Sequence, residues 1–359
     1  MKVVIRTDAS IEIGTGHVMR CVTLAKQLRN RGATVTFVCR DFPGNSIKFI
    51  EREEFDVVSL SCEEKQDNVQ WVKLNWQQDA DDTKSILKGL CNETDLLVVD
   101  HYGIDIQWEA EVRLFVSKIM VIDDLADRKH ECDLLLDQNY YLDKERRYMG
   151  LVPNNCVQML GPDYLLLREE FIETVKISRE RTGQIRNILI FFGGTDPTGE
   201  TIKVLDAIKQ MALSGIEINV VVGTANPNVE KVKKICSQMV NTNFFCQISN
   251  MAELMNMADL AIGAGGSTTW ERCLLGLPAI TVTIADNQQE LTEVIANQGA
   301  IINLGDISEF TKESIQNVML ELLQNQEKVK LMSEKCAEFV SVSSVKKRQV
   351  IRKVMELLL

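Results

Sequence analysis

Long apolar segments are missing from this sequence of 359 residues. No run approaches the roughly 18 apolar residues that a membrane-spanning helix needs. The chain leads directly into a strand-like segment, without a basic and then apolar leader of the secretory kind. From these two absences we expect a cytoplasmic protein that has no stable association with a membrane.

Paired cysteines are also missing. The ten cysteines are scattered, with no CxxC pair and no zinc-site spacing, so we expect reduced thiols that pack as small apolar side chains. Histidine occurs only three times. Asp123 and Asp124 are then the one conceivable pair of metal ligands, but adjacent acids at a strand end serve more often as hydrogen-bonding groups. We expect neither a metal site nor any other cofactor.

The sequence also lacks an excess of basic residues. Lysine and arginine number 40 against 51 acidic residues, which gives a formal net charge of −11. Such a charge repels nucleic acid and anionic membranes. We therefore expect a small-molecule partner and no nucleic acid, and an anionic ligand must be held by helix ends and a few basic side chains.

The sequence does contain a regular alternation of short β-rich apolar runs and helical patterns. Parallel strands need crossover connections, usually helices, and the length suits two domains. The alternation therefore predicts an α/β fold with two doubly wound, Rossmann-like domains. Strands are expected at 3–6, 35–39, 57–60, 96–100, 119–123, 134–137, 188–192, 218–222, 244–246, 260–262, 279–282 and 301–302.

A charged run over 178–186 resembles an interdomain linker. We place the boundary near residue 175, which gives an N-terminal domain over 1–175 and a C-terminal domain over 176–359. The chain ends in a helical pattern over 345–358 that can pack back across the domains.

Polar side chains follow several expected strands of the first half, at positions where such strands end. In open α/β sheets, ligands bind outside the carboxyl ends of the strands. We therefore expect these side chains to face one crevice. They are Asp8, Ser10, Asp100, His101, Tyr102, Asp123, Asp124, Asp137, Gln138 and Asn139.

One histidine has a position that suggests chemistry. Gly14 and Gly16 allow a sharp turn after the first strand, and a helix is expected to start at about His17. The positive end of the helix dipole disfavours the imidazolium, so a neutral ring there can take a proton from water. The alternative is a histidine that only caps or packs the helix. The carboxylate partner of His17 is left open among Asp8, Asp100 and Asp123.

Three glycine-rich or polar turns mark the second half. The stretch 263–267 reads Gly-Ala-Gly-Gly-Ser between a strand and a helix, where backbone N–H groups and the helix dipole form a diphosphate site. Thr268 and Glu271 match a capping box equally well. The other turns are Gly193-Gly194-Thr195-Asp196 and 285–290, for which the alternatives are a tight strand–helix connection and a helix cap.

Taken together, these motifs resemble the nucleotide-sugar hydrolases of pseudaminic acid biosynthesis, the UDP-2,4-diacetamido-2,4,6-trideoxy-β-L-altropyranose hydrolases. The resemblance covers nearly the whole chain. It implies a GT-B fold similar to that of the MurG-type glycosyltransferases, with water replacing the sugar acceptor and no need for metal. The matching residues are Arg6, Asp8, Ser10, Ile13, Gly14, Gly16, His17, 100–103, 123–124, 132–133, 151–153, Tyr164, 167–168, 170–171, 193–196, Ser267, Glu271 and 287–288.

The resemblance also implies residue roles. His17 is the base for the attacking water, and Tyr102 and Asn287 line the sugar site. Ser267 holds phosphate, Glu271 meets the ribose hydroxyls, and the backbone around Ile248 reads the uracil. The remaining residues assigned to the substrate are Asp8, Ser10, Gly14, Gly16 and Gln288, and those assigned to UDP are Gly193, Gly194, Gly265 and Gly266.

Two other functions remain open from the sequence. A MurG-like transferase would hand the sugar to a lipid or another acceptor, although no basic, apolar membrane-facing patch is evident. A non-catalytic nucleotide-sugar binding protein of polysaccharide assembly would keep 265–271 but would not need His17. Hydrolysis by direct attack of water at C1 predicts inversion. No motif accounts for residues 61–84.

Overall fold

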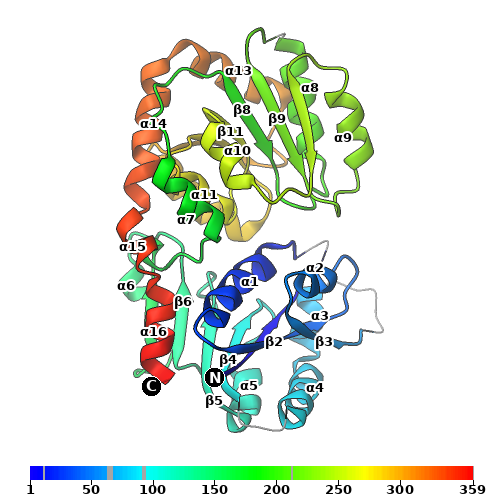
Figure 1. Ribbon diagram of the computed structural model, residues 1–359, viewed down its shortest axis with the longest axis vertical. Helices are drawn as coiled ribbons and strands as arrows, with labels where there is room; N and C mark the ends of the chain where they lie inside the picture. The colour runs from blue at the N-terminus through cyan, green and yellow to red at the C-terminus, as the bar shows by residue number, and fades with distance from the viewer. Residues whose placement is uncertain (11–12, 63–67, 91–93, 212, 359) are drawn as a thin grey trace. The chain divides into compact units, whose positions relative to one another are not determined.

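The computed structural model of the chain describes residues 1–359 except 11–12, 63–67, 91–93, 212 and 359. The chain divides into two compact units (Figure 1). Unit 1 comprises Met1–Leu166 and Lys347–Leu359, and unit 2 comprises Leu167–Lys346. Each unit is built on one parallel sheet.

Unit 1 carries a seven-stranded sheet in the order β3-β2-β1-β4-β5-β6-β7. Its strands are β1 (Lys2–Thr7), β2 (Thr34–Arg40), β3 (Asp56–Leu60), β4 (Thr94–Asp100), β5 (Val116–Ile122), β6 (Leu134–Asp137) and β7 (Val157–Leu160). Its helices are α1 (Gly16–Arg29), α2 (Ile47–Arg52), α3 (Asn68–Leu74), α4 (Trp76–Gly89), α5 (Ile106–Val112), α6 (Lys144–Arg147) and α16 (Gln349–Leu358), with 3₁₀ turns η1 (Arg113–Phe115) and η2 (Pro162–Tyr164).

The strands of unit 1 form because their apolar side chains are buried on both faces of the sheet. In β4, Leu96 and Val98 enter one core cluster, while Leu97 and Val99 enter a second. Helix α1 covers the first of these faces with an apolar stripe that includes Val18. This near-continuous apolar pattern is typical of parallel sheets that helices cover on both sides.

Unit 2 carries a six-stranded sheet in the order β10-β9-β8-β11-β12-β13. Its strands are β8 (Asn187–Phe191), β9 (Glu217–Val222), β10 (Thr242–Cys246), β11 (Leu260–Ala264), β12 (Ala279–Thr283) and β13 (Ile301–Asp306). Its helices are α7 (Glu169–Thr174), α8 (Glu200–Met211), α9 (Val229–Cys236), α10 (Met251–Met257), α11 (Thr268–Leu274), α12 (Gln289–Asn297), α13 (Lys312–Gln324), α14 (Gln326–Phe339) and α15 (Val342–Lys346), with η3 (Val175–Ile177) and η4 (Asp286–Gln288).

Each strand expected from the sequence is present, which confirms the α/β class with two doubly wound sheets. Strand β7 was not predicted. This edge strand pairs with β6 alone and leaves Val157 and Gln158 exposed, so it lacks the apolar run that marks the buried strands.

The division into units differs from the expected boundary near residue 175. Leu166 packs in the core of unit 1, whereas α7 packs against α10 of unit 2. The charged run expected as a linker lies within unit 2, because Arg181 donates hydrogen bonds to the carbonyls of Met255, Ala258 and Leu275. The C-terminal helix α16, red in Figure 1, belongs to unit 1 and buries Val350, Ile351 and Val354 in its core.

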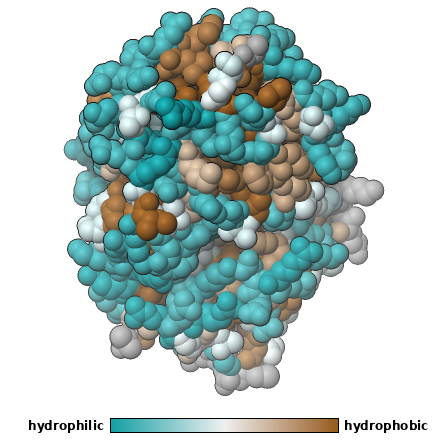
Figure 2. Space-filling model, turned by 45° about the horizontal axis from the view of Figure 1, so that its top comes forward, coloured by the Kyte–Doolittle hydropathy of each residue, from teal (hydrophilic) through white to brown (hydrophobic). Residues whose placement is uncertain are grey.

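The face drawn in Figure 2 is mostly hydrophilic, with apolar residues gathered in a few patches. Within the described part of the chain, no helix is both long and apolar enough to cross a membrane. Apart from Cys62, which is half-buried, the described cysteines are free thiols, and these are buried except for the half-buried Cys246. Cys91 lies outside the described residues.

Candidate active site

The polar residues of unit 1 gather where the strand order reverses. Strand β1 pairs with β2 on one side and with β4 on the other. The side chains that follow β1 and β4 therefore lie at the carboxyl edge beside this switch point. Open α/β sheets bind their ligands at such points.

The turn after β1 leads into α1 by a short hydrogen-bonded loop. The Gly14 N–H donates to the Ser10 carbonyl at 2.9 Å, and the Ile13 N–H donates to Ser10 Oγ at 3.0 Å. Gly14 has a φ of 74°, a conformation that favours glycine. Gly16 is the first residue of α1, and His17 follows it, as the sequence predicts.

His17 is bound through its Nδ1 atom to Asp100 Oδ1, at the end of β4. Arg20, one turn further along α1, donates to both Asp100 oxygens at 2.6 and 2.7 Å. This arrangement selects Asp100 from the carboxylates that the sequence left open. With Nδ1–H donated to Asp100, the lone pair of the neutral ring is on Nε2, to which no described residue is hydrogen-bonded.

Asp124 and Tyr102 complete a closed cycle of contacts that includes His17, Asp100 and Arg20. Arg20 Nη1 binds Asp124 Oδ2 at 3.0 Å, and the Tyr102 hydroxyl donates to Asp124 Oδ1 at 2.7 Å. The Tyr102 ring meets the His17 ring edge to face, with centroids 4.5 Å apart. The imidazole is therefore held by a carboxylate at one nitrogen and by an aromatic ring beside it.

Charge pairing keeps Asp100 ionised in this buried position. Burial alone would raise the pKa of Asp100, yet Arg20 and His17 hold that pKa well below its usual range. An ionised Asp100 accepts the Nδ1 proton and stabilises an imidazolium when it forms. This is the orientation that a general base requires.

The other two histidines are enclosed in structural contacts. The Gly103 N–H donates to His101 Nδ1 at 2.9 Å, and His101 Nε2 faces Asp8 at 3.3 Å. Burial lowers the pKa of His101. His130 donates from Nδ1 to Glu109 at 2.7 Å and is only 1% exposed.

Asp8 belongs to a buried ion-pair network and is fully enclosed. Arg6 binds both Asp8 and Asp79 at 2.7 Å, and Arg40 binds Asp79 at 2.8 Å. Trp108 Nε1 also donates to Asp79 at 3.0 Å. Asp79 lies in α4, so the segment 61–84, which has no motif, supplies the anion that neutralises two buried arginines.

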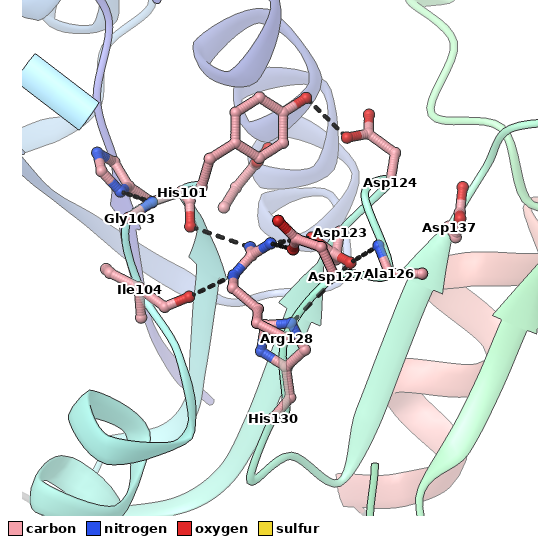
Figure 3. Close-up of polar contacts among 12 residues, drawn as sticks. His101, Gly103, Ile104, Asp123, Asp124, Ala126, Asp127, Arg128, His130 and Asp137 are labelled. Carbon is pink, nitrogen blue, oxygen red and sulfur yellow. Dashed lines mark hydrogen bonds and ion pairs between the residues drawn. The ribbon is translucent and has the colours of Figure 1, made fainter. Parts of the chain in front are cut away.

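Asp123 and Asp124 bind different cations, and Figure 3 shows the cation of Asp123, which is Arg128. Asp123 binds Arg128 Nη1 at 2.9 Å, and Arg128 also donates to the Ile104 carbonyl at 2.8 Å. Asp124 binds Arg20 instead. Among the described residues, no group of three or more histidine, cysteine and acidic side chains could hold a metal ion.

Asp137, at the end of β6, is almost fully buried. It accepts hydrogen bonds from the Tyr148 hydroxyl and from Arg147 Nε, both at 3.0 Å. Burial raises the pKa of Asp137 to about 7, and the charge of Asp124 adds to the rise. Asp137 therefore changes charge near neutral pH.

We expect this carboxyl to make the stability of the protein pH-dependent. The folded form binds the Asp137 proton more tightly than the unfolded chain does, so the stabilisation is fully present below the unfolded pKa and is lost as pH rises through about 7. Through Asp137 alone, the free energy of unfolding should fall by roughly 1 to 2 kcal/mol between pH 6 and pH 8. Denaturant titration of wild type and Asp137→Asn at both pH values measures this. An equal pH dependence in the two proteins would contradict it.

In unit 2, the glycine-rich turn expected to hold a diphosphate follows β11, again at a point where the strand order reverses. A side chain on Gly265 would lie 2.2 Å from Thr292 Oγ1 of α12, so close packing there requires glycine. Gln288 lies against Gly266. Ser267 is the exposed N-cap of α11, and its side chain makes no capping hydrogen bond.

Glu271 does not form the capping box that the sequence allowed, because α11 begins at Thr268, one residue earlier than that motif requires, and its N-cap is Ser267. Its carboxylate instead receives Arg168 in two parallel contacts, Nε to Oε1 at 2.9 Å and Nη2 to Oε2 at 3.0 Å. Arg168 also binds Glu170 at 2.6 Å. Glu170 in turn accepts the N–H of Ala252 at the start of α10.

The remaining predicted UDP residues lie on neighbouring turns of unit 2. Gly193 and Gly194 follow β8, which pairs directly with β11. Ile248 lies between β10 and α10, and the start of α10 is tied through Glu170 and Arg168 to Glu271. Asn287 lies in η4, beside Gln288.

Sequence reasoning assigned no role to several charged residues that the structure brings into these sites. Arg20 was detectable, since its spacing of three residues from His17 places both on one face of a helix. Arg272 carries a buried positive charge under the glycine-rich turn, where it donates to the Ala264 carbonyl at 3.0 Å. Burial lowers the pKa of Arg272. No sequence pattern indicates the ion pairs of Asp79, because its partners Arg6 and Arg40 are distant in the sequence.

Comparison with known proteins points to nucleotide-sugar enzymes. Residues 188–349 match the model of the glycosyltransferase family 28 C-terminal domain. The chain is 30% identical over 300 residues to the UDP-2,4-diacetamido-2,4,6-trideoxy-β-L-altropyranose hydrolase of Campylobacter jejuni, with 83% of this chain and 97% of that protein covered. It is 28% identical to the spore coat polysaccharide biosynthesis protein SpsG of Bacillus subtilis, over 85% of this chain and 84% of that protein.

Solved structures confirm the expected GT-B fold. MurG of Acinetobacter baumannii superimposes with a TM-score of 0.65 at 17% identity, covering 98% of this chain and 99% of that one. At this level of identity the similarity concerns the fold alone.

Proposed function

The chain belongs to the family of the UDP-2,4-diacetamido-2,4,6-trideoxy-β-L-altropyranose hydrolases, and from this premise we propose that it hydrolyses that nucleotide sugar to UDP and the free sugar. The reaction would serve pseudaminic acid biosynthesis. The observation that carries the proposal is His17, oriented through Nδ1 by Asp100 with Nε2 bound by no described residue. A non-catalytic binding protein would not need this arrangement.

In the proposed mechanism, unit 1 supplies the base. His17 Nε2 takes a proton from water as the water oxygen attacks C1, and Asp100 stabilises the resulting imidazolium. The bond between C1 and the diphosphate oxygen breaks, and the electron pair leaves with UDP. Attack opposite the leaving group inverts the configuration at C1.

Unit 2 is assigned to UDP. Its diphosphate would meet the turn with Gly265, Gly266 and Ser267, beneath which Arg272 adds positive charge. UDP is a good leaving group, and donors fixed at this turn stabilise its departure without a protein acid. Metal is not required in this scheme, since Asp123 and Asp124 already bind Arg128 and Arg20.

A MurG-like transferase is the alternative, and the family 28 match of 188–349 is the observation that favours it. The two functions differ in their need for an acceptor. We expect the purified protein to release UDP from the nucleotide sugar without any acceptor, at an unchanged rate in EDTA. Release that depends on an added acceptor would support the transferase. Loss of release in EDTA, restored by magnesium or manganese, would contradict the metal-independent mechanism.

The contact of Glu271 with the ribose is a separate expectation. We expect Glu271→Ala to weaken UDP binding by on the order of 1.5 to 3 kcal/mol, because hydrogen bonds to a charged acceptor are lost. Calorimetric titration with UDP measures the affinity, and a melting curve reports any loss of stability from the broken Arg168 contact. A variant that melts at a lower temperature but binds UDP as wild type does would assign Glu271 to structure alone.

A further inference from the structure

Asp124 binds both Tyr102 and Arg20, two residues from different parts of unit 1 that each help to hold His17. Its Oδ1 accepts from the Tyr102 hydroxyl at 2.7 Å, and its Oδ2 binds Arg20 at 3.0 Å. Tyr102 packs against the imidazole ring, and Arg20 holds the carboxylate of Asp100, which binds His17 Nδ1. The Asp124 carboxylate therefore contacts both the residue that packs against the His17 ring and the residue that holds Asp100, the hydrogen-bonded partner of His17.

The position of Asp124 is itself fixed by its backbone. Its carbonyl accepts from the Tyr141 hydroxyl at 3.0 Å and from Arg147 Nη2 at 2.9 Å. The side chain points from this anchored loop toward the tyrosine hydroxyl drawn in Figure 3. The backbone of Asp124 is therefore tied to two other side chains of unit 1, and its carboxylate contacts Tyr102 and Arg20 from this anchored point.

The cluster also has a definite charge balance. Arg20 lies between Asp100 and Asp124 and forms ion pairs with both. Two carboxylates against one guanidinium leave one net negative charge, which matches the positive charge that His17 gains on taking a proton. Without Asp124, Arg20 would cancel the charge of Asp100, and the imidazolium would form in a cluster without compensating charge.

We propose that Asp124 is a positioning residue for His17, holding Tyr102 and Arg20 in place and keeping the His17 surroundings net negative so that the imidazolium is stabilised. As a statement about catalysis, this inference rests on the proposed function. Burial and Asp124 raise the pKa of Tyr102 well above its usual range, so its hydroxyl remains the donor. Burial opposes the charge of Arg20, but Asp100 and Asp124 raise the pKa of Arg20.

The charged and titratable groups that bear on His17 come from three elements. Arg20 and Cys21 lie on α1, Asp100 ends β4 with Tyr102 just after it, and Asp124 follows β5. Cys21 donates from Sγ to Asp100 at 3.4 Å, and burial raises the pKa of the Cys21 thiol well above its usual range. The thiol is therefore neutral. Arg147 and Asp137 form an ion pair at 3.0 Å beside Asp124, and within the described part of the chain neither is hydrogen-bonded or ion-paired to His17 or Asp100. Next to His17 the charges are those of Asp100, Arg20 and Asp124.

The test follows the protonation of His17 directly, by NMR of the full chain with isotope-labelled histidine. Three histidines are present, so the His17→Asn spectrum assigns the His17 signal. The variants are Asp124→Asn, which removes the negative charge, and Arg20→Gln, which removes the positive one. Asp127→Asn is the matched control, because it removes a carboxylate that also follows β5 but binds Arg128 rather than Arg20.

The two charge variants should move the His17 titration in opposite directions. We expect the midpoint to fall by about 1 pH unit in Asp124→Asn and to rise in Arg20→Gln, with the midpoint of Asp127→Asn unchanged. In UDP release, kcat of Asp124→Asn should fall about 10- to 100-fold, and its acid limb should move to lower pH. Affinity for UDP alone should not change, because UDP is assigned to unit 2.

An unmoved midpoint in folded Asp124→Asn, or shifts of the same sign in both charge variants, would overturn the inference. If Asp124→Asn does not fold, Arg20→Gln still tests it, because a lower or unchanged midpoint there contradicts the charge balance. The NMR result is independent of activity. If the His17 midpoint shifts with the expected signs but the protein releases no UDP, the role of Asp124 toward His17 is supported and the proposed function is contradicted.

Discussion

Replacing His17 by asparagine is expected to lower turnover by roughly 10² to 10⁴-fold, the usual contribution of a general base. The asparagine amide can still donate to Asp100 in place of Nδ1–H, so the Asp100 and Arg20 contacts need not be lost. It cannot take up a proton near neutrality. The loss should appear in kcat, because proton removal is needed only in the transition state.

UDP affinity and the melting temperature are the controls for His17→Asn. Both should stay near the wild-type values, since UDP is assigned to unit 2 and the apolar stripe of α1 is unchanged. A folded variant that binds UDP and still releases it within tenfold of the wild-type rate would exclude His17 as the base.

Asp100→Asn is expected to cause a loss of similar size, on the order of 10² to 10⁴-fold in kcat, by another route. An amide donor at this position favours a proton on Nε2 of His17, and the ring then has no lone pair for water. The buried Arg20 also loses the carboxylate that it contacts at 2.6 and 2.7 Å. We therefore expect a lower melting temperature in addition to the loss of rate.

The matched control for Asp100→Asn is Asp133→Asn. Asp133 is also a carboxylate of unit 1 that binds an arginine, Arg113, but it precedes β6 rather than following a strand. Its loss should change stability and leave kcat unaffected. Equal kcat values in Asp100→Asn and wild type would show that the Asp100 contact does not orient the base.

The strands and the switch points could be predicted because their signals are local. Short apolar runs separated by helical patterns predict a parallel sheet, and the polar side chains after β1 and β4 follow from the same pattern. The position of His17 at the start of a helix was predictable for the same reason.

The contacts that select among these residues are not local. Asp100 is 83 residues from His17, and the sequence alone ranked it equally with Asp8 and Asp123. Asp8 is instead paired with Arg6, and Asp79 completes that pair from a segment without a motif. Ion pairs between residues that are distant in the sequence determine which carboxylate binds His17. The periodicity of apolar residues contains no information about these pairs.

Glu271 shows the same limit in unit 2. The sequence offered a capping box or a ribose contact, and the structure adds Arg168, 103 residues away, as its partner. The unit boundary at Leu166 was missed because the arginine-rich run over 178–186 resembles a linker in composition. Its side chains nevertheless bind carbonyls of unit 2.

The most direct test of hydrolysis at C1 is turnover of the nucleotide sugar in ¹⁸O-labelled water without an acceptor. The account predicts that the released UDP carries no label, because water attacks carbon and the original oxygen leaves with the diphosphate. NMR at early times should show the inverted anomer of the free sugar as the first product. Label in UDP would place the attack at phosphorus, and a first product with retained configuration would rule out direct displacement by water activated at His17.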